Sequence, residues 1–541
     1  SVRHAGECFY WMMMAYSVPA VIFRILTNRA YRFFFHNRMR KKLELIGLLA
    51  GVLLFVLPVL FQTRLLSLRL DSDWDIVLPL YGYAARYIRE QRSIPLMFPY
   101  AGRGYPILAD PLSAVLNPFF MVPLAVFGLD TGMSVVFILL PILAGICMMV
   151  LLARLEVSGW IRIWGSLLYA ISGALTARFA AGHTLFFLSY PIVPLLFAGI
   201  LTAPSNIRWT VVVAVVFTFM FFSGDVYGVW FGLLFFAATR AYWLCAYRSE
   251  RNRMVIHSVG VLVLFLLLAS LKLLPVLRDT LPRMQRLFRP VFGEGSVHAV
   301  LFPFFYMIPF RETFYDRPFF QRTLGFHFNW YEYYAFISPL PFMFLVAIRK
   351  IWDRRVVRLL VFILLASSLY LAMGYPYSPF YWLFRWVPAL GVLRVPQRIA
   401  LYATAPLIAL CALCAAELWK EKKLRRWIVL LCIGSLLWTF VVSRNAFLVA
   451  FEKPRQEEKA LVQELRRRDG SDFAVVTHVC CMQRFLTEAG IGVYNYYVPW
   501  RDKDLPPDDE MIFRLRPKYV VEKLDIDISS QAYYPLFATP I

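Results

Sequence analysis

Three aspartates at alternate positions are the residues whose types and spacing most directly suggest chemistry. Asp71, Asp73 and Asp75 follow the first long apolar run of the chain. Carboxylates at the mouth of a membrane suit a general base or the ligands of a divalent cation. The plainer interpretation is the polar start of a loop. The run that follows, IVLPLYGYAARYIREQ, has the apolar spacing of a helix lying along the membrane interface, which would hold the carboxylates in place.

A further acidic residue, Asp110, lies in the run PYAGRGYPILADPLSAVLNPFF. Gly102, Gly104 and several prolines predict a shaped loop rather than a helix for this run. Asp110 is therefore a candidate substrate-binding residue, and simple turn chemistry is the alternative.

Three ionisable residues stand at the predicted outer ends of apolar runs. They are His183 in AAGHTLFFLSYPIVP, Asp225 in FFSGDVYGVW and Glu332 in FNWYEYYAFISPLP. Ionisable groups near membrane depth are candidates for function. A lone histidine is more often structural, however, and the aromatic neighbours of Glu332 are also typical of an interfacial anchor belt. We take His183 and Glu332 as candidate substrate-binding residues.

Arginines supply candidate binding sites for phosphate. Arg394 and Arg398, in LGVLRVPQRIALYA, are spaced four apart and share a face if the helix extends that far. Two guanidinium groups there suit a lipid phosphate, with snorkelling as the alternative. The region 276–331 interleaves arginines with Phe and Tyr. It fits either a docking surface for an anionic lipid or simple attraction to headgroups.

Composition defines the elements that must position these residues. The 541-residue chain is 60% hydrophobic and 17% charged, against about 25% charged residues in a soluble domain. This excludes disordered, collagenous and disulfide-stapled classes and argues against a soluble enzyme. The net charge of +23 lies largely in short loops, as the positive-inside rule predicts. Since no nucleic-acid-binding module is visible, we expect membrane lipids and no nucleic acid as partners.

Apolar runs predict eleven membrane spans, at about 44–62, 131–153, 161–178, 184–203, 209–222, 226–244, 256–275, 332–349, 357–373, 398–418 and 426–443. The short ones are typical of broken helices that line a cavity. The parity of the crossings places the basic clusters RNR, RKIWDRR and KEKKLRR on the cytoplasmic side. It leaves three long outside regions, 63–130, 276–331 and 444–541.

We therefore expect an all-α polytopic membrane protein with a small α/β C-terminal domain outside the membrane. Residues 1–43 are predicted to be a basic cytoplasmic or interfacial segment, 44–443 the multi-span domain and 444–541 the extracytoplasmic domain. In the last segment EEKALVQELRRRDG predicts a solvated helix, and DFAVVTH and PKYVVEKL predict strands. The charge bias is compatible with a bacterial inner membrane.

Known motifs exclude some activities. The sequence contains no GxxxxGK[ST], GxGxxG or HExxH pattern, which argues against an ATP-driven pump. Cys411 and Cys414 form a CxxC pair inside an apolar run without flanking ligands. Helix packing explains them better than metal or redox chemistry.

The ordered set of motifs resembles the type C glycosyltransferase superfamily (GT-C), within its YfhO-like branch. The matching stretches are DWDIVLPLY and PLMFPYAGRGYPILADPLSAVLNPFF after the first span, AGHTLFFLSYPIVPLL, NWYEYYAFISPLPFMFL and LRVPQRIALYATAPLIAL. The resemblance covers roughly residues 44–420. Each motif is weak alone, and their order is moderately specific.

The resemblance implies an enzyme that works on the outer face of the membrane. Its donor would be a sugar linked to polyprenyl phosphate, and its catalytic residue a carboxylate of the first outside loop. By matching position Asp73 is the first choice, followed by Asp75 and Asp71, although three acids stand where one clear pair is expected. A divalent metal at Asp71, Asp73 and Asp75 is weakly implied, and no other cofactor is expected. The acceptor, the sugar and the stereochemistry are open.

Two other functions remain open on the sequence. A transporter or flippase of a lipid-linked or anionic solute would use the short spans and the polar residues at membrane depth. A non-catalytic membrane assembly subunit would use the C-terminal domain as a docking module.

Overall fold

The computed structural model of the chain describes residues 38–61, 73–100, 105–157, 159–202, 206–246, 251–280, 303–308, 332–372, 395–448, 460, 463–467, 474–477, 492–493, 519–523 and 536–540. Two predicted site residues, Asp71 and Arg394, lie outside the described residues. So does most of the arginine-rich region 276–331.

The first helices follow the predicted order. α2 (Arg38–Phe61) covers the first apolar run, and α3 (Trp74–Gln91) begins within the aspartate cluster, directly after Asp73. The shaped loop that follows α3 is confirmed over 105–117. It ends at α4 (Pro118–Phe127), which leads into α5 (Leu129–Arg154). A proline begins α4, where its missing N–H and fixed φ suit the first helical position.

The prediction of one continuous span at 161–178 is wrong. The chain forms α6 (Trp160–Ala170), breaks, and resumes as α7 (Gly173–Ala181). At the break the chain approaches another segment closely: the Gly173 N–H donates to the Phe336 carbonyl at 2.8 Å, and a Cβ on Gly173 would lie 2.2 Å from the ring of Tyr334. A helix interrupted in this way is tolerated in a membrane protein where the freed backbone groups are buried in protein.

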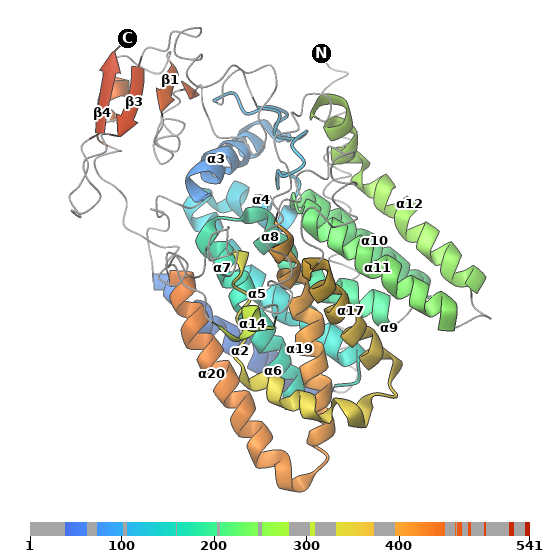
Figure 1. Cartoon of the computed structure of the whole chain (residues 1–541). Helices are drawn as coiled ribbons and strands as arrows, with labels where there is room; N and C mark the ends of the chain where they lie inside the picture. Colours follow the sequence, from blue (N-terminus) through green and yellow to red (C-terminus); the bar gives the residue numbers. More distant parts are fainter. Residues whose placement is uncertain are drawn as a thin grey trace.

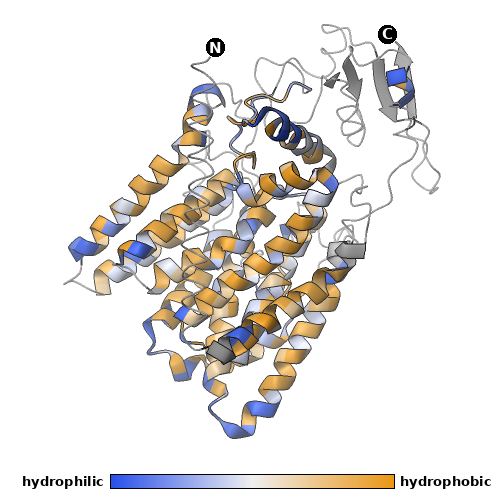
Figure 2. Cartoon of the chain, turned by 180° about the vertical axis from the view of Figure 1, so that it is seen from behind, coloured by the Kyte–Doolittle hydropathy of each residue, from blue (hydrophilic) through white to orange (hydrophobic). Residues whose placement is uncertain are grey.

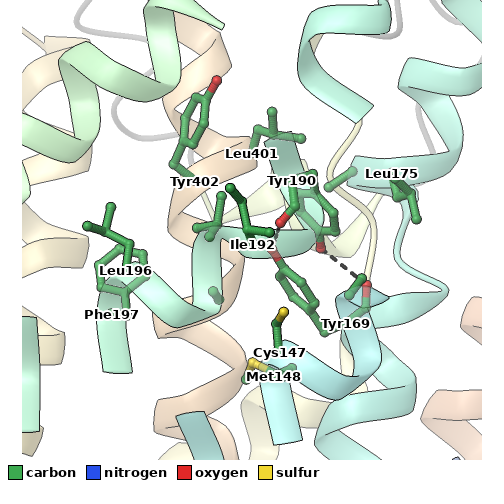
Figure 3. Packing of buried hydrophobic residues seen from close by; sticks show 14 of the residues in the cluster. Cys147, Met148, Tyr169, Leu175, Tyr190, Ile192, Leu196, Phe197, Leu401 and Tyr402 are labelled. Atoms are coloured by element: carbon green, nitrogen blue, oxygen red, sulfur yellow. Dashed lines mark hydrogen bonds between the residues drawn. The ribbon is translucent and has the colours of Figure 1, made fainter. Parts of the chain in front are cut away.

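The break is packed by two tyrosines from separate segments. Tyr169 and Tyr190 stack with ring centroids 4.3 Å apart, and the Tyr169 hydroxyl donates to the Tyr190 carbonyl at 2.7 Å. The Tyr190 hydroxyl lies 2.7 Å from Ser172 in the break itself. Figure 3 shows the two rings among buried side chains that include Cys147 and Ile192.

The chain continues through α8 (Thr184–Ser189), the 3-10 turn η1 (Tyr190–Ile192), α9 (Val193–Thr202), α10 (Ile207–Phe222), α11 (Val226–Ala246), α12 (Arg251–Pro275) and the π-helical η3 (Val276–Thr280). The remaining helical elements are α14 (Phe304–Met307), η5 (Leu340–Ile351), α17 (Arg355–Ala372), η7 (Pro396–Arg398), α19 (Ile399–Leu418), η8 (Lys422–Leu424) and α20 (Arg425–Leu448).

The predicted span at 332–349 is helical only in its second part. Residues 332–338 form an irregular buried segment, and the 3-10 helix η5 begins at Leu340. Pro339 and Pro341 explain the difference. Proline lacks the N–H that an α-helix needs and disfavours the helical conformation of the residue before it.

Burial separates central helices from those that face the lipid. The apolar windows of Thr184–Leu201 and of α19 are 94% buried, whereas those of α12 and α20 are 17% and 28% buried. Beyond the basic first turns of α12 and α20, many of their exposed side chains are apolar, as an acyl-chain environment requires. They include Ile256, Val259, Leu262, Val263, Leu266, Leu267, Leu430, Ile433, Leu437 and Val441.

Within the described residues, six helices are long and apolar enough to cross a membrane: Leu129–Arg154, Thr184–Leu201, Val226–Ala246, Arg251–Thr280, Ile399–Leu418 and Lys422–Asn445. The chain is thus an integral membrane protein with an all-α bundle. The total of eleven spans stays a prediction.

The two ends of the bundle differ in charge. In Figure 1 the start of α12 and the connections η5–α17 and α19–α20 lie toward the end of the bundle away from α3, which lies at the top. Exposed basic residues gather on these connections, which Figure 2 shows as hydrophilic ends of apolar helices. They include Arg251, Arg253, Lys350, Arg354, Lys422 and Arg426. The predicted parity thus places the α3 side outside.

The C-terminal segment contains a mixed sheet. Its described strands are β1 (Ala474–Thr477), β2 (Gly492–Val493), β3 (Tyr519–Lys523) and β4 (Leu536–Pro540). Their order is β2-β1-β3-β4, with β1 parallel to β2 and β3, and β4 antiparallel to β3. Both predicted strands are present, and parallel pairs require crossover connections. Figure 1 shows the sheet at the α3 end of the molecule. A complete α/β domain at 444–541 stays a prediction.

Candidate functional site

The start of α3 places Asp73 against the turn between α7 and α8. Asp73 is the residue before the first helical turn, and its backbone N–H donates to the Ala181 carbonyl at 2.9 Å. The next residue, Trp74, is fully buried and donates its indole N–H to the Phe179 carbonyl at 2.7 Å. The Asp73 side chain is nevertheless 48% exposed. A firmly held backbone thus presents a carboxylate that a substrate can reach.

His183 connects this carboxylate to the interior. Its Nε2 lies 3.4 Å from Asp73 Oδ2, and its Nδ1 lies 3.1 Å from a terminal guanidinium nitrogen of Arg178. The imidazole is buried, and its ring meets the Phe186 ring edge-on with centroids 5.7 Å apart. The imidazole of His183 is therefore fixed by Asp73 and Arg178 at its two nitrogens and by packing against Phe186.

Behind His183, a buried glutamate lies between two guanidinium groups. Arg178 donates to Glu332 Oε2 at 2.6 Å. Arg398 donates its Nε–H to the same carboxylate at 3.0 Å and makes a second, shorter contact to Oε1. Burial alone opposes ionisation of Glu332, but Arg178 and Arg398 hold its pKa well below the usual range. The three side chains form a buried charged cluster with one net positive charge.

Aromatic rings enclose the guanidinium groups of the cluster. The Arg398 guanidinium carbon lies 4.6 Å from the ring centroids of Phe186 and of Tyr227. That of Arg178 lies 5.2 Å from the Phe186 ring. Cation–π contacts strengthen when they are desolvated, so the rings hold both arginines in place without neutralising them.

Most residues of this cluster were predicted from the sequence, but Arg178 was not. The structure brings Asp73, His183, Glu332 and Arg398 together, although their roles in binding or catalysis stay predictions. Arg178 is the missing connection, because it contacts both His183 and Glu332. The sequence feature that could have identified Arg178 is a single arginine at the end of the apolar run 161–178, five residues before His183.

Asp225 has a structural role. Its carboxylate accepts from the Ser189 hydroxyl and from the Gly228 N–H at 2.7 Å, and lies 2.6 Å from the Tyr402 hydroxyl. The residue is fully buried. It therefore joins the end of α8 to the starts of α11 and α19.

Asp110 lies in a different environment from Asp73. Its carboxylate accepts from the Tyr105 hydroxyl and from the Leu112 N–H at 2.5 Å. The buried ammonium of Lys272 donates to the carbonyls of Pro111 and Ser113, which flank Leu112. Burial raises the pKa of Asp110 above its ordinary value. These contacts shape the 105–117 loop, and a part for Asp110 in substrate binding stays a prediction.

The described residues do not provide a complete metal site. They include no group of three or more His, Cys, Asp or Glu side chains arranged to hold an ion. Asp73 and His183 are the two potential ligands nearest to each other in the cluster, while Glu332 is engaged by two arginines. The predicted ligand set also needs Asp71, which lies outside the described residues, and Asp75, of which only the helical backbone is described.

The fold of this bundle is similar to that of solved glycosyltransferases. It is similar to the oligosaccharyltransferase of Archaeoglobus fulgidus, solved with zinc and sulfate, at 12% identity and a TM-score of 0.52. That match covers 88% of this chain and 68% of the archaeal one.

The arabinofuranosyltransferase AftD from Mycobacteria is also similar, at 13% identity and a TM-score of 0.55. The match covers 89% of this chain but 35% of AftD, so the chain spans about a third of that protein. No protein family and no curated sequence matches the chain. The likeness therefore concerns the fold.

Proposed function

We propose that the protein is a membrane glycosyltransferase that moves a sugar from a polyprenyl-phosphate-linked donor to an acceptor outside the membrane. One observation supports this most strongly. A half-exposed carboxylate, Asp73, lies beside a buried cluster with net positive charge, on a fold shared with two membrane glycosyltransferases. The reaction needs both a base and a cationic group for the leaving phosphate.

In this proposal Asp73 is the general base. Its carboxylate takes the proton of an acceptor hydroxyl while the hydroxyl oxygen bonds to the anomeric carbon of the donor. The bond from that carbon to the phosphate oxygen breaks, and the phosphate leaves with the electron pair. The anchored start of α3 supports this role, since the Ala181 and Phe179 carbonyls fix the backbone around Asp73.

Arg398 is the group that we assign to the phosphate. Its side chain is 11% exposed at the edge of the cluster. Its contacts with Glu332 use Nε and one terminal nitrogen, which leaves the other terminal nitrogen for a phosphate oxygen. An aimed guanidinium stabilises charge that develops on the leaving group better than mobile water does. Arg394 is proposed as a second phosphate ligand from its position in the sequence.

The experiment is a turnover assay on the purified protein in nanodiscs. Hexose- and pentose-linked polyprenyl phosphates are supplied with a crude envelope glycan fraction, and release of free polyprenyl phosphate is measured. We expect release by the native protein and a loss of at least about 100-fold in Asp73→Asn. Asp130→Asn, on the exposed first turn of α5, is the matched control and retains activity. Equal turnover by Asp73→Asn and the native protein would reject Asp73 as the base.

A further inference from the structure

The contact between Arg178 and His183 determines which nitrogen of the imidazole carries hydrogen. A guanidinium has only N–H donors and stays protonated in proteins, so it cannot accept a hydrogen bond. His183 Nδ1 lies 3.1 Å from Arg178 and 3.9 Å from Glu332 Oε1, which is beyond hydrogen-bond distance. Nδ1 therefore accepts from Arg178. In the neutral imidazole that leaves the hydrogen on Nε2, the atom that faces Asp73.

The neighbouring contacts fix this assignment. The same terminal nitrogen of Arg178 donates to Glu332 at 2.6 Å, and its two hydrogens serve the glutamate and the histidine separately. Arg178 is buried. Because Glu332 is itself bound by Arg398, Arg178 cannot turn away without breaking a buried ion pair.

A histidine that binds a metal shows the opposite pattern. Its free nitrogen bonds to the metal while the other ring N–H donates to a carboxylate, carbonyl or water. In this chain the other nitrogen faces a donor. Nε2 therefore carries a hydrogen where a cation would need a lone pair. Two guanidinium groups within the same cluster also repel a cation.

We propose that His183 is a positioning residue that donates its Nε2–H to the Asp73 carboxylate, and that these two residues do not jointly hold a divalent cation. The weakly implied metal at the first-loop aspartates thus disagrees with the side chains beside Asp73. The separation of 3.4 Å is at the long end for such a bond. Hydrogen bonds at catalytic groups are often long before substrate binds. This inference rests on the proposed function for its catalytic meaning.

The first experiment compares three substitutions of His183 in the turnover assay. His183→Gln keeps an amide donor for Asp73 and an acceptor for Arg178, but it is a poor metal ligand. His183→Asp keeps a metal ligand but has no donor at neutral pH. His183→Ala keeps neither. We expect His183→Gln to retain most of the turnover, and the other two to lose about 100-fold through a misplaced carboxylate.

The outcomes separate the two interpretations. Activity in His183→Asp together with loss in His183→Gln would show metal ligation and overturn the proposal. Equal losses in all three variants would show that the imidazole only fills space, which overturns it as well. Turnover by the native protein is also measured with and without EDTA, and we expect no difference.

A second readout does not depend on turnover. Protein with ¹⁵N-labelled histidine shows whether each ring nitrogen carries hydrogen, and the His183→Gln variant identifies the His183 signal among the 7 histidines. We expect hydrogen on Nε2 and no change on adding Mg²⁺ or Zn²⁺. Hydrogen on Nδ1, or a shift with either metal, would overturn the proposal. If the native protein releases no polyprenyl phosphate, the proposed function fails while this measurement still decides the role of His183.

Discussion

Gly182 lies directly against the backbone of Asp73. A Cβ at Gly182 would be 2.9 Å from the carbonyl carbon of Asp73 and 2.5 Å from the nitrogen of the next residue, Trp74. Gly182 also has a φ of +76°, a conformation that residues with a Cβ rarely adopt. The close approach is what brings His183 within reach of the Asp73 carboxylate.

Gly182→Ala should therefore push Asp73 away from His183. We expect turnover to fall by about 100-fold, because small displacements of a reacting group have effects of this size. Gly128→Ala is the matched control, since Gly128 has a similar φ of +80° but no atom within 4 Å of its Cβ position. Its φ of +80° and ψ of 176° lie in a region that is almost confined to glycine. Gly128→Ala should therefore lose about 1–3 kcal/mol of stability, but its folded fraction should keep its turnover. Equal turnover in the two variants would show that the contact is unimportant.

Glu332→Gln should destabilise the protein strongly. It leaves the buried guanidinium groups of Arg178 and Arg398 without their carboxylate, and breaking a buried pair costs about 3–5 kcal/mol. Glu44→Gln, which breaks the buried Glu44–Arg162 pair, should have a similar effect on thermal unfolding. We expect only Glu332→Gln to reduce turnover beyond what its lower stability explains. Parallel losses of turnover in both variants would contradict this assignment.

The charge of Glu332 also predicts how stability depends on pH. Its pKa lies well below the usual range in the folded protein, whereas an unfolded glutamate titrates near pH 4.3, so roughly below that value the unfolded chain binds the extra proton. The stabilisation is therefore present above this pH and is lost as the pH falls further. Between about pH 6 and pH 3.5, the melting temperature of the native protein should fall more than that of Glu332→Gln. Identical slopes would refute this.

A labelling experiment tests which side of the membrane carries the site. Cys245, at the end of α11, is exposed on the side of the basic connections, and Arg89 is exposed on α3. In a background with Cys8, Cys480 and Cys481 replaced by serine, a membrane-impermeant maleimide should label Arg89→Cys in intact cells. Cys245 should react only after the membrane is opened. The reverse pattern would place the site inside and remove the proposed outer-face acceptor.

Much of the fold could be predicted from apolar periodicity. Runs without interruption, such as 131–153 and 398–418, became single helices because length and hydropathy are enough to define them. The predictions failed where a distant contact overrides the local pattern. At the break, Gly173 packs closely against Tyr334 and its N–H donates to Phe336, both of which are far away in the sequence. The irregular 332–338 segment was signalled by prolines whose effect the hydropathy of the run concealed.

The candidate site could be predicted as a set of residues but not as a geometry. Asp73, His183, Glu332 and Arg398 stood out because polar groups near membrane depth are costly. Their mutual contacts depend on how four separate segments pack, which no local pattern encodes. Asp225 shows the limit of this rule. Its buried carboxylate is stabilised by hydrogen bonds from Ser189, Gly228 and Tyr402, so its position near membrane depth does not by itself indicate a function. Arg178 was missed because it ended an otherwise ordinary apolar run.

The cluster of Arg178, Glu332 and Arg398 also constrains how the protein is made. Glu332 follows Arg178 by 154 residues and Arg398 follows Glu332 by another 66. A ribosome that delivers the chain from its N-terminus therefore inserts Arg178 long before its partners exist. Until the segment that carries Glu332 emerges, the nascent bundle holds the Arg178 charge without its carboxylate. The cluster is thus among the last parts of the bundle to be completed, and the early helices are inserted into the membrane before its ion pairs can form.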